Sequence, residues 1–321
     1  MRLTQAWMAS PGPRRVREAG LLGLKGFCMG AADVVPGVSG GTIAFITGIY
    51  DDLLAAIRSF DAGALGRLAR LDVPGALARV HLRFLLSLLL GLGLAVVSVA
   101  RLMHWLLTVH PAPTWALFFG LIAASIWVVG RRVDRWTAGA WGWAVLGGVG
   151  SWVLVGLIPV TTPDALWFVF LSGALAICAM ILPGISGSYI LLLIGKYEFV
   201  MAALRAPFDH GNLLVLAVFL SGAGLGIAAF SRLLGWLLVR FHRPMMALLT
   251  GFMAGAMRKI WPWKEVLQTR EVAGKVFVLR EANVLPPDWG TGFWLAVGLA
   301  LVGAVAVLAL ERLAEGDPKP A

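Results

Sequence analysis

The chain of 321 residues is 59% hydrophobic and only 14% charged, and it carries 14 tryptophans and a formal net charge of +10 at pH 7. A soluble domain of this length could not bury that much apolar surface, so the composition excludes a soluble globular protein. It indicates an all-α polytopic membrane protein, with the membrane bilayer as partner, no nucleic acid and no cofactor. The histidines and the two cysteines show no metal-ligand spacing, and we expect no metal site.

The chain begins with a basic, polar segment, residues 1–19, which we predict to be cytoplasmic. Two short apolar stretches follow, 21–35 and 38–50. Pro36 and Gly37 separate them, and the second stretch begins with Val38-Ser39-Gly40-Gly41-Thr42. Helix-breaking backbone at membrane depth is tolerated only where it is buried in protein or lines a polar cavity. The pattern therefore predicts a re-entrant hairpin of two half-helices over 21–57.

A charged linker and three apolar windows complete the first half of the chain, residues 20–160. The linker, 58–83, places arginines among Leu, Ala and Val, which predicts an amphipathic helix on the cytoplasmic leaflet. Each window is long enough, or nearly so, to cross about 30 Å of hydrocarbon at about 1.5 Å per residue. These three predicted spans lie within 84–158, at 84–108, 114–130 and 139–158.

The second half, residues 161–311, has the same order of elements. Its apolar stretches 166–182 and 185–200 flank Pro183-Gly184-Ile185-Ser186-Gly187-Ser188 and predict a second re-entrant hairpin over 166–204. Three further spans are predicted within 211–310, at 211–231, 244–257 and 291–310. The loop 258–290 is predicted to be external, with a short hairpin or lid around Glu271 to Leu279, although its six Lys and Arg residues fit that side poorly. Residues 312–321 are predicted to be a cytoplasmic tail.

The two halves align as an internal repeat. An offset of 147 matches Pro36 with Pro183, and an offset of 131 matches Arg101 with Arg232 in a second block. Chance apolar similarity would not place Pro, Arg, Trp and Gly in register. Because each half holds an odd number of spans, the second half enters from the opposite face, which predicts an inverted repeat. The arginine-rich loops predict a cytoplasmic N-terminus.

Each break is a candidate anion site. The first N–H groups of the half-helix after the break have no intrahelical partner, and glycine lets a ligand approach the backbone. The candidate phosphate-binding residues are Pro36, Gly37, Ser39, Gly40, Gly41, Thr42, Pro183, Gly184, Ser186, Gly187 and Ser188. The alternative is that Pro and Gly only kink buried helices and that the serines cap them.

Charged residues in apolar segments add further candidates. Arg101 and Arg232 could supply forked donors to a phosphate, or they could snorkel to the interface beside a tryptophan one turn later. Asp33 is a candidate for proton coupling, or for a structural ion pair with Lys25, Arg101 or Arg232. For Lys196 and Glu198, interfacial salt bridges are the preferred interpretation.

The segment from Lys25 to Tyr50, with the second Pro183-Gly184-Ile185-Ser186-Gly187-Ser188, resembles bacterial membrane proteins of domain-of-unknown-function family 368. The resemblance covers about residues 20–311. That family is associated with undecaprenyl phosphate translocation. The resemblance implies return of this carrier lipid's monophosphate from the outer to the inner leaflet of the cytoplasmic (inner) membrane, for reuse in cell-wall and surface-glycan synthesis.

A polyprenyl phosphate fits the break sites, because its small anionic head needs a polar path while its tail can stay in lipid. We expect an alternating-access transporter and no covalent chemistry, and a homo-oligomer is compatible with the sequence. Two rivals remain. One is a polyprenyl pyrophosphate phosphatase, for which the chain lacks a paired-glutamate motif. The other is a transporter of a small soluble anion.

Overall fold

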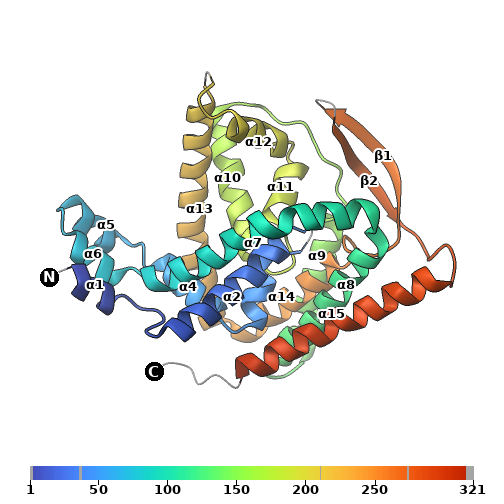
Figure 1. The fold of residues 1–321 in the computed structure, drawn as a ribbon, viewed down its shortest axis with the longest axis horizontal. Coiled ribbons are helices and arrows are strands. Elements are labelled where there is room, and N and C mark those ends of the chain that lie inside the picture. The colour runs from blue at the N-terminus through green and yellow to red at the C-terminus, as the bar shows by residue number, and fades with distance from the viewer. Residues whose placement is uncertain (1–2, 36–37, 210, 273–274, 316–321) are drawn as a thin grey trace.

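A computed structural model of the chain describes residues 3–35, 38–209, 211–272 and 275–315 (Figure 1). Pro36 and Gly37 of the first break lie outside the described residues. Helices make up most of the described fold. The first half contains α1 Leu3–Ala9, α2 Val16–Asp33, α3 Gly40–Ile46, α4 Tyr50–Arg58, α5 Ala62–Ala69, α6 Val73–Arg79, α7 Leu82–Val109, α8 Pro111–Arg131 and α9 Ala138–Leu154. The second half contains α10 Leu166–Ile181, α11 Gly187–Leu193, α12 Tyr197–Arg205, α13 Asn212–Arg240, α14 His242–Ala256, β1 Lys264–Val272, β2 Lys275–Asn283 and α15 Thr291–Glu315.

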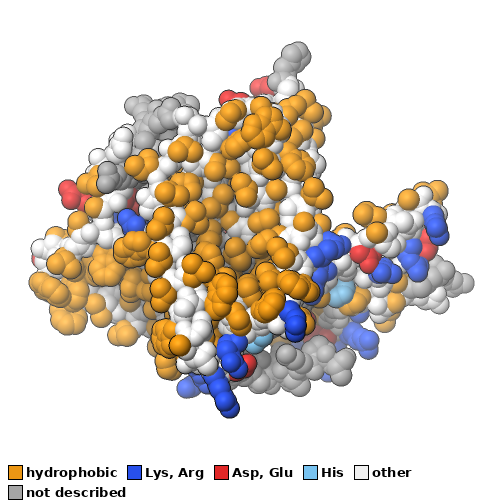
Figure 2. Space-filling model, turned by 180° about the vertical axis from the view of Figure 1, so that it is seen from behind, with side chains coloured by type: hydrophobic (Ala, Val, Ile, Leu, Met, Phe, Trp, Pro, Cys, Tyr) orange, Lys and Arg blue, Asp and Glu red, His pale blue; other side chains and the backbone are white. Residues whose placement is uncertain are grey.

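Four of the described helices are long and apolar enough to cross a membrane: α7, α8, α13 and α15. The other two expected spans are the shorter helices α9, with 17 residues, and α14, with 15 residues. Large hydrophobic side chains are exposed along α7, α9, α13 and α15. Figure 2 shows the broad apolar surface that such side chains form on one face of the molecule. Lipid is the solvent that suits such a surface, and the chain is a multi-pass helical membrane protein.

The two halves use the same helix pairs. In the first half α2 packs along α7, and in the second α10 packs along α13. The other two main pairs join the halves, because α8 packs on α15 and α14 packs on α9. In the repeat α2, α7, α8 and α9 correspond to α10, α13, α14 and α15. Replacing each helix by its counterpart gives the same four pairs, as expected for a repeat. The inverted orientation of the halves in a membrane stays a prediction.

Glycines at matched repeat positions allow these helices to cross closely. A Cβ atom on Gly91 of α7 would collide with the backbone carbonyl of Gly23 in α2, and one on Gly222 of α13 would collide with that of Phe170 in α10. Gly120 and Gly251, also 131 residues apart, lie equally close to the backbones of α15 and α9. Small residues at such crossings let helix backbones approach in lipid, where dispersion contacts drive association.

The half-helices after the breaks are shorter than the sequence predicts. Instead of continuing to about residues 50 and 200, α3 and α11 end after seven residues each. The chain then bends by 116° into α4 and by 110° into α12. Gly48 and Gly195, which are 147 residues apart, adopt positive φ angles of 72° and 67° at these bends. Glycine populates this region without the steric cost of a Cβ, which explains why both bends use it.

The linker 58–83 was expected to be one amphipathic helix, and that expectation is wrong in detail, because it folds into the two short helices α5 and α6. Asp61 and Asp72 accept hydrogen bonds from the first turns of these helices and form ion pairs with Arg79 and Arg67. These side chains cap the helices and so divide the linker. With α1, the two helices form a lobe at one side of the molecule that carries much of the basic charge visible in Figure 2.

The loop between α14 and α15 contains an antiparallel β-hairpin of β1 and β2, with a register shift between Val266 and Gln268. Aromatic side chains surround its base: Trp263 lies beside Trp261 and stacks on Phe293. The indole N–H of Trp261 also donates to the carbonyl of Val284 at 2.9 Å. Tryptophans of this kind are typical of a membrane interface. The face of the membrane on which the hairpin lies stays a prediction.

Candidate functional site

The two breaks, far apart in sequence, meet inside the fold. The Ser39 hydroxyl donates to the carbonyl of Leu182 at 3.1 Å, and the backbone N–H of Gly184 donates to the Thr42 hydroxyl at 3.2 Å. The Tyr50 hydroxyl donates to the carbonyl of Ile181 at 3.2 Å. Ser39, Thr42 and Gly184 are buried, so these bonds join polar backbone of both halves away from lipid. We call the two breaks, residues 39–42 and 181–188, together with the contact between them, the break junction.

At the first break, a carboxylate already occupies the start of the half-helix. Asp33 Oδ1 accepts from the backbone N–H of Gly40 at 2.7 Å, and the Ser39 hydroxyl accepts from Gly41 N–H at 3.2 Å. Of the two alternatives for Asp33, proton coupling or an ion pair with Lys25, Arg101 or Arg232, the structure does not show the ion pair. No described lysine or arginine forms a salt bridge with it, and Lys25 instead donates to the carbonyl of Thr47 at 3.1 Å. A carboxylate is stable there because backbone N–H groups and the helix dipole favour an anion.

The second break lacks this carboxylate, because Met180 takes the equivalent place. Ser186 stands before α11, but its side chain makes no capping hydrogen bond to the helix backbone. Its hydroxyl lies instead 2.8 Å from that of Ser188, whose side chain is exposed. The two breaks therefore differ: the first is closed by its own carboxylate, and the second presents hydroxyl groups without an internal anion.

Polar side chains also hold the far ends of α3 and α11. The Lys25 bond to Thr47 satisfies a carbonyl after α3, and Thr162 donates to the carbonyl of Ile194 after α11 at 2.5 Å. Lys196 is almost fully buried, and its ammonium lies 2.5 Å from Asp164. At the surface, Glu198 pairs with Arg205 at 3.3 Å. Lys196 and Glu198 thus lie in ion pairs that fix the second hairpin in place.

The two arginines of the repeat lie away from the break junction. Arg101 and Arg232 are both exposed on their helices. Arg232 donates to the carbonyls of Ala228, at 2.6 Å, and Phe60, at 3.3 Å. Neither guanidinium group has a hydrogen bond to a described residue of either break. This placement favours the snorkelling interpretation over direct binding at the junction.

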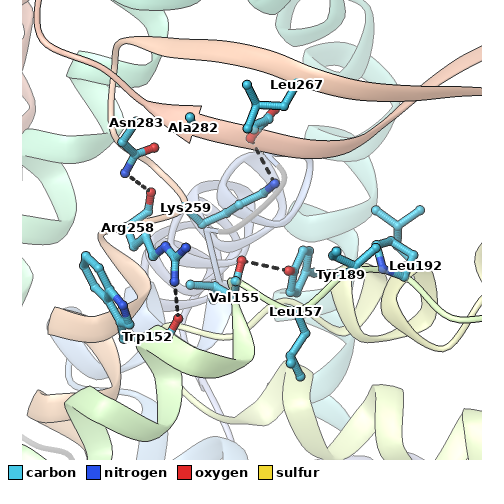
Figure 3. A pocket seen from close by; sticks show the side chains of 14 residues that line it. Trp152, Val155, Leu157, Tyr189, Leu192, Arg258, Lys259, Leu267, Ala282 and Asn283 are labelled. Atoms are coloured by element: carbon cyan, nitrogen blue, oxygen red, sulfur yellow. Dashed lines mark hydrogen bonds and ion pairs between the residues drawn. The ribbon is translucent and has the colours of Figure 1, made fainter.

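Two cavities lie at opposite ends of α14. A cavity of about 530 Å³ lies at its C-terminal end beneath β1 and β2, and we call it the hairpin cavity (Figure 3). A cavity of about 370 Å³ at its N-terminal end is lined by Phe45, Arg132, His242 and Met246, among others. Between them, Gly184 of the second break packs against the backbone of Met253 in the same helix. α14 has 15 residues and is about 22 Å long. One cavity lies at each of its ends and Met253 contacts the second break, so this one helix links both cavities to the break junction.

The hairpin cavity contains two cations that belong to neither break motif, Arg258 and Lys259. In the sequence they stand out only as charges that fit an external loop poorly, since positively charged loops favour the cytoplasmic side. That misfit was the available signal. No group of three or more His, Cys, Asp or Glu side chains suited to a metal ion occurs among the residues that the structure describes.

The fold and the break junction define a class: a multi-pass helical membrane protein with two broken helices that meet in its interior. The chain belongs to the undecaprenyl phosphate translocase-like family, whose model matches residues 29–277. It is 42% identical over 299 residues to the polyprenyl-phosphate transporter of Vibrio cholerae serotype O1, a match that covers 91% of this chain and 96% of the relative. The polyprenyl-phosphate transporter of Staphylococcus aureus is 31% identical over 254 residues, covering 74% of this chain and 85% of the relative.

These matches confirm the resemblance drawn from the break motifs. No solved structure matches this chain.

Proposed function

We propose that this chain carries a polyprenyl phosphate, undecaprenyl phosphate in particular, across the bacterial cytoplasmic membrane. The direction is from the outer to the inner leaflet, which returns the carrier lipid to cell-wall and surface-glycan synthesis. The relatives named as polyprenyl-phosphate transporters support the substrate. The observation that carries the proposal on this chain is the break junction: buried polar backbone from both halves meets inside a protein whose outer surface is apolar.

The phosphate head group is held at the break junction while the prenyl tail remains in lipid beside the protein. The hydroxyls of Ser186 and Ser188, which are hydrogen-bonded to each other at 2.8 Å, receive the anion first, because no internal carboxylate competes with it there. The N-terminus is cytoplasmic, and the two halves form an inverted repeat that rocks about the junction to open each side in turn. Both cavities at the ends of α14 reach the helices of the breaks, which supports such an exchange.

Inward transport of an anion opposes the usual inside-negative potential at a cost of about 2.3 kcal/mol per charge per 100 mV. We propose that a proton offsets this cost through Asp33. While ionised, Asp33 holds the Gly40 N–H at the first break. Protonation weakens that bond and frees the N–H for the phosphate, so one proton enters with each head group.

A liposome experiment tests this function. Purified full-length protein is reconstituted with a fluorescent polyprenyl phosphate, and a membrane-impermeant quencher reports the fraction in the outer leaflet over time. The account predicts faster leaflet exchange than in protein-free liposomes. Unchanged exchange would refute it. Release of inorganic phosphate from added polyprenyl pyrophosphate would indicate the phosphatase, and uptake of labelled phosphate without lipid movement would indicate a transporter of small anions.

A further inference from the structure

We propose that the hairpin cavity is a separate binding site for a phosphate monoester, with Arg258 and Lys259 as the side chains that bind it. The site stands outside the break junction, at the C-terminal end of α14. Its role as a docking place for the transported lipid rests on the proposed function. Its ability to bind a phosphate group does not.

Arg258 is oriented toward the cavity with most of its donors unused. Its guanidinium group packs over the ring of Trp152 at 4.8 Å and donates through Nη1 to the carbonyl of Trp152 at 3.1 Å. Gly156 makes room for it, because a Cβ atom there would collide with the guanidinium. A guanidinium group carries five N–H donors in a planar fork, and no other hydrogen bond from this side chain occurs among the described residues. The remaining donors suit two oxygens of a phosphate.

Lys259 brings a second cation to the same space. Its ammonium group lies 3.1 Å from Glu281 of β2 and 5.4 Å from the centre of the Tyr189 ring. Glu281 also faces Lys264 at 3.7 Å, so one carboxylate stands among three cations, counting Arg258. Burial pushes the pKa of Glu281 upward, but Lys264 and Lys259 outweigh it and hold that pKa below its usual value. The cluster therefore keeps an excess of about two positive charges near neutral pH, which matches a phosphate monoester.

The cavity reaches the second break directly. Tyr189 and Leu192 line it, and both belong to α11, the short helix that begins directly after Ser186 (Figure 3). Its volume of about 530 Å³ is in the range of small-ligand pockets. A head group bound by Arg258 and Lys259 would lie beside α11, the helix that follows the second break.

The repeat provides independent support. Leu192 corresponds to Phe45 at the offset of 147, and Phe45 lines the cavity at the N-terminal end of α14. That cavity contains Arg132 after α8, as the hairpin cavity contains Arg258 after α14, and each cavity also holds a carboxylate, Asp51 in the first and Glu281 in the second. A head-group site at each end of a central junction is the arrangement that alternating access requires.

Binding to the detergent-solubilised full chain tests the proposal, with farnesyl phosphate, inorganic phosphate and phosphate-free farnesol as probes. We expect farnesyl phosphate to bind, and Arg258→Gln and Lys259→Gln each to weaken it about tenfold or more. Lys259→Arg should retain most of the affinity. Arg135→Gln removes an equal charge from an exposed residue outside the cavity and should bind as wild type.

The probes separate the sources of phosphate. Tight binding of farnesyl phosphate with weak binding of inorganic phosphate identifies a lipid head-group site, while equal binding identifies a site for free phosphate; farnesol should not bind. No binding by the wild type, or wild-type affinity in folded Arg258→Gln and Lys259→Gln, would overturn the proposal. Leaflet exchange measured on the same samples keeps the two ideas distinct. If the wild type exchanges lipid but the two variants bind farnesyl phosphate as the wild type does, only this site is refuted. If the variants lose binding but the wild type shows no lipid exchange, only the transport function is refuted.

Discussion

Replacing Thr42 with valine tests the contact between the breaks. Valine keeps the shape of threonine but removes the hydroxyl that accepts the Gly184 N–H at 3.2 Å. The N–H is buried and would be left without its partner, which costs about 1–3 kcal/mol. We therefore expect Thr42→Val to lower the free energy of unfolding by that amount and to slow leaflet exchange of polyprenyl phosphate.

Thr250→Val is the matched control. Thr250 is also buried, but its hydroxyl donates to the carbonyl of Met246 in its own helix at 2.7 Å. Losing that bond leaves the α14 backbone paired, so the change should cost only about 0.6 kcal/mol. Denaturant unfolding in detergent, followed by tryptophan fluorescence, measures both variants. If Thr42→Val proved no less stable than Thr250→Val and exchanged lipid at the parental rate, the contact between the breaks would not matter as argued.

Further predictions concern a helix crossing, a buried lysine and the proposed proton step. Gly120→Ala should destabilise the protein by about 1–3 kcal/mol in the same unfolding assay, because the new Cβ meets the backbone of Ala300. Its control, Gly142→Ala, places the Cβ in open space and should not destabilise the protein. Burial lowers the pKa of Lys264 to about 8, below the value near 10.4 of an unfolded chain. The unfolded state therefore binds more protons above pH 8, so this residue makes the unfolding free energy rise with pH there, and Lys264→Met should remove that rise. Asp33→Asn keeps an oxygen that can accept the Gly40 N–H, but its side chain cannot titrate. Lipid exchange by the folded variant should therefore no longer respond to an imposed proton gradient. An unchanged response would exclude Asp33 as the coupling group.

The sequence was sufficient to predict features that depend on local pattern. Composition predicted the membrane class, and Pro-Gly in an apolar stretch predicted both breaks. The offset of 147 also paired Gly48 with Gly195, and both take positive φ angles at equivalent bends. Such features follow from backbone chemistry at a few neighbouring residues.

Features that depend on distant contacts were not predictable. Nothing local in the sequence indicates that the partner of Asp33 is the Gly40 N–H rather than a cation. The hairpin cavity needs Arg258 beside Gly156 and Lys259 beside Glu281, and only the folded chain brings those residues together. For Arg101 and Arg232 the repeated charge left two interpretations, phosphate binding or snorkelling, and only the fold shows that both side chains are exposed.

Leaflet exchange by a junction variant tests the central claim most directly. The variant combines Ser39→Ala with Ser186→Ala, one buried serine from each break. Its control combines Ser98→Ala with Ser221→Ala, two exposed serines on α7 and α13. If the phosphate passes through the break junction, the junction variant should exchange polyprenyl phosphate at least about tenfold more slowly than the control while remaining folded. Equal rates in the two folded variants would contradict the account.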